Sequence, residues 1–122
     1  MIRVLIYVPA VVLLASAWAG QAAEKADRAQ LAQCQAEYKV AKALLAKSQK
    51  NNSIQHRFIV ATDRYATASM FSIVLETKIK YRQALHLYRE VLKIDPNNHE
   101  ASVNSAEIIA VYHSLHRPVP QD

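Results

Sequence analysis

The apolar residues after residue 22 recur three and four positions apart, which is the period of an amphipathic α-helix. Residues 22–52 contain no Gly or Pro and are rich in good helix formers, so we expect an N-terminal helix there. Asn51-Asn52-Ser53 interrupts the pattern, and Asn52 with Gln55 approximates a capping box for the next helix. The predicted inward stripe of the N-terminal helix is Leu31, Cys34, Tyr38, Ala41 and Leu45.

A second stripe follows with the same period and a wider apolar surface, which predicts a helix covered on more than one side. Its members are Ile54, Phe58, Ala61, Tyr65, Ala68, Ser72, Leu75 and Ile79. Two further helices are expected on either side of Asp95-Pro96, because proline disfavours helical geometry in the residue before it. Asn98 is the expected N-cap of the last one, whose inward residues are Ala101, Ser105, Ile108, Tyr112 and Leu115. The pattern therefore predicts an all-α bundle.

The connection between the second and third helices has no turn signal of its own. Residues 76–81 contain no Gly, Pro or Asn, so periodicity alone allows one helix from Ile54 to Ile94. At ~1.5 Å per residue that helix would be roughly 60 Å long, too long for a compact domain of this size.

Residues 65–98 resemble a tetratricopeptide repeat, a 34-residue helix-turn-helix unit. Ala84 and Tyr88 match its small and aromatic positions, and Pro96 matches its exit. The first half departs from the pattern, with Ala68 at the Trp position, Phe71-Ser72 at Leu-Gly and Leu75 at Tyr. Residues 99–117 resemble the first helix of a following repeat, so the resemblance implies antiparallel hairpins over residues 53–117.

The resemblance also implies a turn near Ile79-Lys80 and a partner-binding groove lined by the first helix of each repeat. That groove would take a peptide or a partner helix. Transferred position by position, its lining residues are Ser69, Ile73, Glu76, Val103 and Glu107.

The first 19 residues have the three parts of a secretory signal peptide: a basic start at Arg3, an apolar stretch and a small-x-small exit. We expect cleavage between Ala19 and Gly20 and export to the periplasm or the medium. Cleavage after Ala17, Ala22 or Ala23 is an alternative. A second alternative is retention of residues 4–23 as a membrane anchor, with the protein held near the membrane.

Composition and charge exclude several classes of function. The single Gly rules out glycine-dependent nucleotide sites, which need positive φ angles. The net charge of +5 suggests nucleic acid as a partner, but an exported protein meets little of it. We therefore expect no nucleic-acid partner, no cofactor and no enzymatic activity.

His113 and His116 are the only weak candidates for metal ligands, because they lie three residues apart on one helix. A stable site needs three or four ligands, and none is close in sequence, so no metal site is predicted. Cys34 lies on the apolar stripe and is expected to fill the core; an intermolecular disulfide is the alternative.

We therefore predict an exported interaction module that binds a protein or peptide and ends in a disordered tail over residues 118–122. Self-association is a further expectation, because the second helix is widely apolar. One alternative is a membrane-anchored structural rod with residues 54–94 as a single helix. Another is a small bundle that binds a metal or small ligand through His113, His116 or Cys34.

Overall fold

The computed structural model describes residues 8–122, with the surroundings of side chains described from residue 17 onward. This part of the chain folds into four α-helices and contains no strand, which confirms the all-α class. The helices are α1 (Val8–Lys47), α2 (Asn52–Met70), α3 (Thr77–Ile94) and α4 (His99–Ser114).

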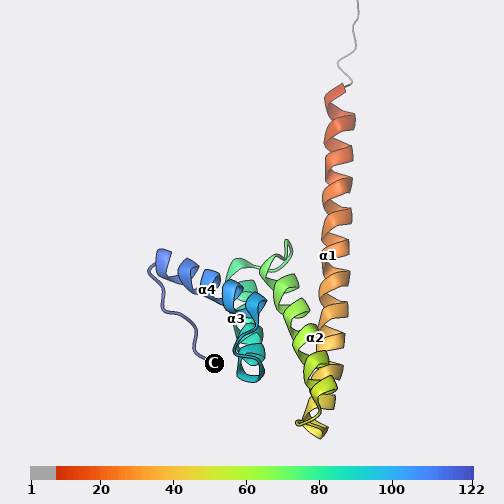
Figure 1. Ribbon diagram of the computed structural model, residues 1–122. Helices are drawn as coiled ribbons and strands as arrows, with labels where there is room; N and C mark the ends of the chain where they lie inside the picture. The colour runs from red at the N-terminus through yellow and green to blue at the C-terminus, as the bar shows by residue number, and fades with distance from the viewer. Residues whose placement is uncertain (1–7) are drawn as a thin grey trace, which may run out of the picture.

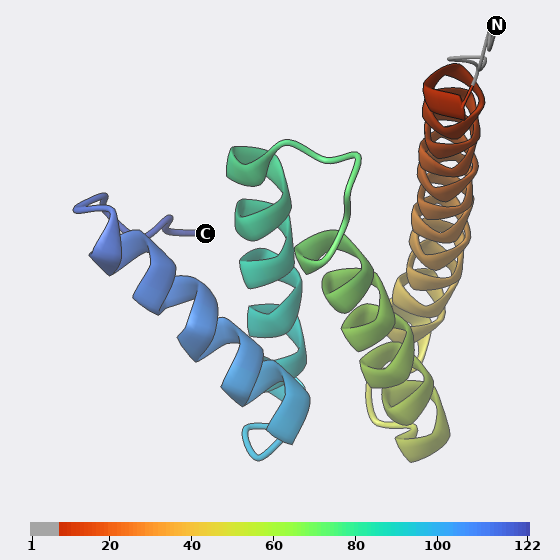
Figure 2. The same cartoon turned by 90° about the horizontal axis from the view of Figure 1, so that it is seen from above.

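The helices form a row in which each packs against its neighbour in the chain. The contacts join α1 to α2, α2 to α3 and α3 to α4, and successive helices run in opposite directions (Figures 1 and 2). Because α1 has 40 residues and α2 only 19, the first half of α1 projects beyond the bundle as a free rod (Figure 1).

Tyrosines and alanines of the predicted stripes form the core. Tyr38 of α1 packs against Phe58 and Tyr65 of α2, with ring centroids 6.1 and 5.6 Å away. Such tilted aromatic pairs stabilise a core beyond the apolar area that they bury. The buried apolar residues are Cys34, Tyr38, Ala41, Phe58, Ala61, Tyr65, Ala66, Met70, Ala84, Leu85, Leu87, Tyr88, Val91, Ala101 and Ile108.

Tyr88 ties the three C-terminal helices together. Its side chain is fully buried, and its hydroxyl lies 2.6 Å from the Thr67 hydroxyl of α2. The Asn104 amide of α4 donates to the same hydroxyl at 2.9 Å. A buried tyrosine needs partners for its polar end, and here one partner comes from each neighbouring helix.

Two asparagines cap helix N-termini, one of them at a position different from the prediction. Asn98 accepts a hydrogen bond from the backbone N–H of Ala101, which confirms it as the N-cap of α4. The cap of α2 is Asn51 rather than Asn52, and it accepts from the N–H of Ile54. Gln55 does not complete a capping box, because its side chain donates to the carbonyl of Gln49.

The connection between α2 and α3 differs from both sequence-based expectations. Residues 71–76 form a loop, so the turn predicted near Ile79-Lys80 is wrong, and so is the single helix over residues 54–94. The loop is held by α1: the Ser72 hydroxyl donates to Asp27 Oδ2 at 2.6 Å, and the Val74 N–H donates to the same oxygen at 3.3 Å. The second-helix stripe therefore ends early, and Ile79 is exposed instead of buried.

The N-terminal helix was expected over residues 22–52. In the structure, α1 begins earlier, at Val8, and runs without interruption through Gly20. The first seven residues of the predicted signal peptide, with the basic start, lie outside the described residues. In the part of the chain that is described, no helix is both long enough and apolar enough to span a membrane.

Residues 117–122 return toward α3 after α4 ends (Figure 1). His116, with a φ of 52°, makes the reversal, and Leu115 is exposed rather than inward. Arg89 of α3 donates to the carbonyl of Pro120 at 2.7 Å, and Val119 packs against the core. The segment expected to be disordered thus follows the surface of α3.

Candidate partner-binding surface

Ser69, the first residue predicted for the partner groove, is fully buried. Its hydroxyl donates to the carbonyl of Tyr65 at 2.7 Å and accepts from the Gln83 amide at 2.7 Å. Both hydrogen bonds are internal to the fold, so Ser69 cannot contact a partner.

The other four predicted residues are exposed but do not share one groove. Ile73 and Glu76 lie in the loop that leads into the N-terminus of α3, whereas Val103 and Glu107 lie on α4, which begins after the C-terminus of α3. The 18 residues of α3 span about 27 Å, so the two pairs lie toward opposite ends of that helix. The early end of α2 causes this separation, because it removes Ile73 from the helix that was expected to carry it.

A different groove runs between α1 and α2, and it has two hollows. The hollow nearer the loop has a volume of about 370 Å³, and the other has about 430 Å³. Arg64 borders both and marks the middle of what we call the α1–α2 groove. The first hollow is lined by Asp27, Gln30, Cys34, Arg64, Thr67, Ala68, Phe71 and Glu100. The second is lined by Glu37, His56, Arg57, Val60, Ala61 and Arg64.

Phe71 is the most exposed apolar side chain of the α1–α2 groove, with 65% of its surface accessible. Its backbone is fixed, because its N–H donates to the carbonyl of Thr67 and so ends α2. Val60 and Arg64 lie one helical turn apart on one face of α2, and Phe71, the residue after its last turn, borders the same hollow as Arg64. The groove therefore presents an aromatic ring on a fixed backbone beside an open hollow.

The charges along the α1–α2 groove have both signs. Arg64 lies 3.9 Å from the Glu37 carboxylate of α1, and both side chains are accessible to water. Glu100 of α4 accepts a hydrogen bond from the Thr67 hydroxyl at 2.5 Å. An exposed pair such as Arg64–Glu37 contributes little to stability, so Arg64 can exchange its acidic partner at low cost.

Cys34 lies at the edge of the first hollow but belongs to the core, as predicted. Burial raises the pKa of its thiol, and the Glu37 carboxylate raises it as well. The thiolate is the nucleophilic form, so these surroundings make the sulfur unreactive at neutral pH.

Asp63 is a buried carboxyl that the sequence patterns did not single out. Only 7% of its surface is exposed, and its Oδ1 atom has no hydrogen-bond partner. Burial and the nearby Glu100 carboxylate raise its pKa to about 6. Its spacing from Ile59 and Ala66 places it on the buried side of α2. This spacing is the feature of the sequence from which the burial of Asp63 could have been predicted.

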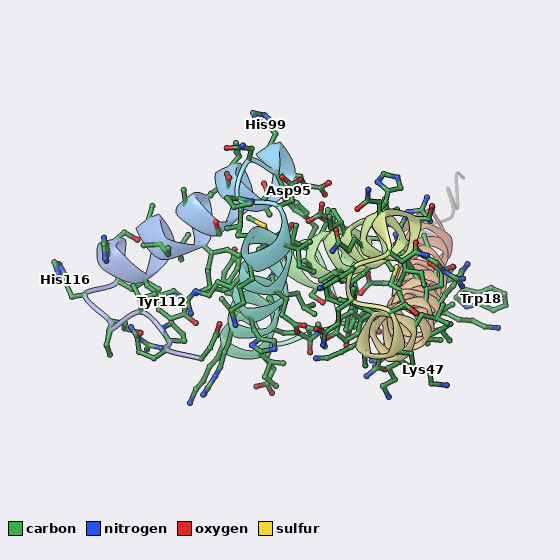
Figure 3. The ribbon with its side chains drawn as sticks, turned by 60° about the horizontal axis from the view of Figure 1, so that its bottom comes forward. Trp18, Lys47, Asp95, His99, Tyr112 and His116 are labelled. Carbon is green, nitrogen blue, oxygen red and sulfur yellow. The ribbon has the colours of Figure 1, made fainter. Side chains whose placement is uncertain are left out.

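The two histidines considered as metal ligands lie at the outer end of the row of helices. His113 and His116 are both exposed, and Figure 3 shows His116 pointing away from the bundle, far from Asp95 and His99. Within the described residues, no three His, Cys, Asp or Glu side chains are arranged to hold a metal ion.

Comparison with known proteins gives no match: no family model, no curated protein and no solved structure matches this chain.

Proposed function

We propose that this chain is an exported, non-enzymatic helical protein of the tetratricopeptide-like kind that binds a protein partner through the α1–α2 groove. The observation that carries the proposal is Phe71, an exposed ring on a fixed backbone beside a hollow of about 370 Å³. Exposed aromatic anchors next to an unfilled hollow are typical of the centres of protein interfaces.

The chemistry of the groove favours an amphipathic helix as the bound element. Its apolar face would pack on Phe71 and Val60, which lie about 17 Å apart along α2 at ~1.5 Å per residue. An acidic residue between these contacts would pair with Arg64, in place of Glu37. A helix laid in a groove is anchored through positions three, four and seven residues apart, and two apolar anchors about eleven residues apart, the sum of a four- and a seven-residue step, would reach both contacts.

Export rests on the pattern of residues 1–19, and the packing of α1 is compatible with it. Residues 20–26 are all exposed, and among the side chains of α1 that are described, from residue 17 onward, Leu31 is the first apolar one that packs on the core. Cleavage between Ala19 and Gly20 therefore leaves every described core contact in place.

The test is photo-crosslinking in cells that naturally make the protein, with a photoreactive phenylalanine analogue at position 71 of the full chain. We expect one dominant adduct, which is lost in the Arg64→Glu variant because the acidic contact becomes repulsive. The matched control carries the analogue at Leu115, the exposed apolar residue that follows α4, and should give no such adduct.

Three outcomes would contradict the proposal. The first is the same adduct from position 115, and the second is an adduct at position 71 that survives Arg64→Glu. The third is an adduct only with a second copy of the chain, which would make the groove a self-association surface.

A further inference from the structure

Residues 117–122, which we call the return segment, lie on α3 and form neither helix nor strand. Arg89 Nη1 donates to the carbonyl of Pro120 at 2.7 Å and to Asp122 Oδ1 at 3.3 Å. His86 Nδ1 lies 3.4 Å from the same Asp122 oxygen. Pro118 and Pro120 have no backbone N–H and favour extended geometry, so the polar contacts of the segment with α3 come from its carbonyl and carboxylate oxygens.

The surface of α3 under the return segment carries a row of basic side chains three or four residues apart. We call Lys78, Arg82, His86, Arg89 and Lys93 the α3 basic row. His86 and Arg89 face Asp122, and His86 Nε2 also lies 3.0 Å from Glu90. In the described part of the chain, Lys78 and Arg82 form no ion pair. The first turns of the row are therefore cationic and unmatched.

The return segment fills only part of the space above the basic row. One hollow of about 520 Å³ lies on one side of Pro120, and another of about 290 Å³ lies on the other. Lys78, Arg82 and Pro120 border both hollows, so the segment divides one longer groove. The exposed side chain of Ile79 adds an apolar contact to the larger hollow.

We infer that the α3 basic row is a docking site for an extended acidic peptide of a partner, and that the return segment is its intramolecular competitor. The segment shows what this surface accepts: a proline-containing chain, neither helix nor strand, whose carbonyl pairs with Arg89 and whose carboxylate pairs with His86 and Arg89. Lys78 and Arg82 extend the row of cationic side chains and line the two unfilled hollows. A longer peptide with a second acidic residue would pair with them as well.

This docking site shares no lining residue with the α1–α2 groove, so the inference does not depend on the proposed function. A tethered occupant competes at an effective concentration in the millimolar range. Weakening its hold on α3 must therefore strengthen the binding of a partner peptide.

The experiment measures the fluorescence anisotropy of a labelled acidic peptide, Glu-Asp-Pro-Val-Pro-Gln-Asp-Glu, titrated with the full chain at about 0.1 M salt. We expect saturable binding that weakens roughly tenfold in the double variant Lys78→Gln/Arg82→Gln, because charge-assisted hydrogen bonds are lost. The control Lys47→Gln/Lys50→Gln removes two exposed lysines near the end of α1 and should change little. Asp122→Asn should strengthen binding several-fold by loosening the competitor.

A second readout uses the unaltered chain with a probe peptide in which every Asp and Glu is replaced by Asn and Gln, which should not bind. The inference is overturned if the acidic peptide fails to saturate even the Asp122→Asn variant, or if both double variants lose binding equally. Tighter, Lys78- and Arg82-dependent binding of a single-stranded oligonucleotide or of anionic vesicles would also overturn it, because the row would then serve another polyanion.

Discussion

The two inner connections of the bundle are built in different ways. Between α3 and α4 the chain turns at Asp95-Pro96-Asn97-Asn98, where proline ends one helix and Asn98 caps the next. Between α2 and α3, residues 71–76 contain no Gly, Pro or Asn, and Asp27 of α1 holds the loop from a distance of 45 residues in sequence. One connection is thus encoded by its own residues and the other by tertiary contacts.

The connections also differ in their electrostatics. At the α2–α3 loop, the Asp27 carboxylate is matched by a hydroxyl and a backbone N–H. At the α3–α4 turn, the buried Asp63 carboxyl faces Glu100 and Asp95, and both of these carboxylates raise its pKa. The locally encoded turn therefore carries an electrostatic cost that the tertiary one avoids.

The largest effect is expected from Asp63→Asn. The pKa of Asp63 is about 6 in the folded chain, against 3.8 for a solvent-exposed aspartate, so the folded state binds more protons between these values. Asp63 therefore lowers stability progressively as pH rises from about 4 to about 6, by about 1–3 kcal/mol in total. At pH 7.5 the variant should be more stable than the parent by that amount, measured by urea denaturation.

Near pH 3 the Asp63→Asn variant and the parent should be equally stable, because the carboxyl is then protonated in both states. The control is Glu107→Gln on an exposed face of α4, which removes a carboxylate outside the core and should not reproduce the gain in stability at pH 7.5. An Asp63→Asn variant less stable than the parent at pH 7.5 would show that the Asn98 side chain, which lowers the pKa of Asp63, outweighs burial and the two neighbouring carboxylates.

The next largest effect, here a loss of stability, is expected from Asp27→Ala, which removes the acceptor that holds the α2–α3 loop. Because a hydrogen bond to a charged group contributes about 1.5–3 kcal/mol, we expect the free energy of unfolding to fall by about 2 kcal/mol. Hydrogen exchange should become faster at the amides of Val74 and Leu75. Glu24→Ala, one turn earlier on the exposed part of α1, is the control. If the amides of Val74 and Leu75 were equally protected from exchange in both variants, the loop would not depend on its contact with α1.

The smallest effect is expected from Asn98→Ala, which removes the cap of α4. The loss should be about 1 kcal/mol, as for other N-cap replacements, with faster hydrogen exchange confined to the first turn of α4. Asn97→Ala, at the exposed neighbouring position, should cost much less. If exchange also became faster in residues 71–76, the two connections would be coupled rather than independent.

The same contrast explains which parts of the fold were predictable. Helical periodicity placed Tyr38 and Tyr65 in the core, and Asp95-Pro96 with Asn98 marked the last turn, because each signal is local. The position of the α2–α3 loop was not predictable in this way. It depends on Asp27, whose spacing from Ser72 carries no helical or turn signal.

The candidate surfaces show the same limit. Ser69 was assigned to a groove by repeat register, but the early end of α2 leaves its hydroxyl internal to the fold. In the sequence, Phe71 was noted only as a departure from the repeat pattern. In the structure, its place at the end of α2 makes it exposed. The return segment contacts α3 through Arg89 and His86. The proline-rich composition of this segment, which suggested a disordered tail, does not predict that contact.

The most direct test of the account is the distance across the α2–α3 connection. Spin labels at Arg57→Cys and Lys93→Cys, two exposed positions, in a Cys34→Ala background report it by pulsed electron resonance. Two antiparallel helices 8–10 Å apart place the labels less than about 30 Å from each other. A continuous helix through residues 71–76 would place them about 54 Å apart at ~1.5 Å per residue, and that distance would contradict the hairpin and the grooves built on it.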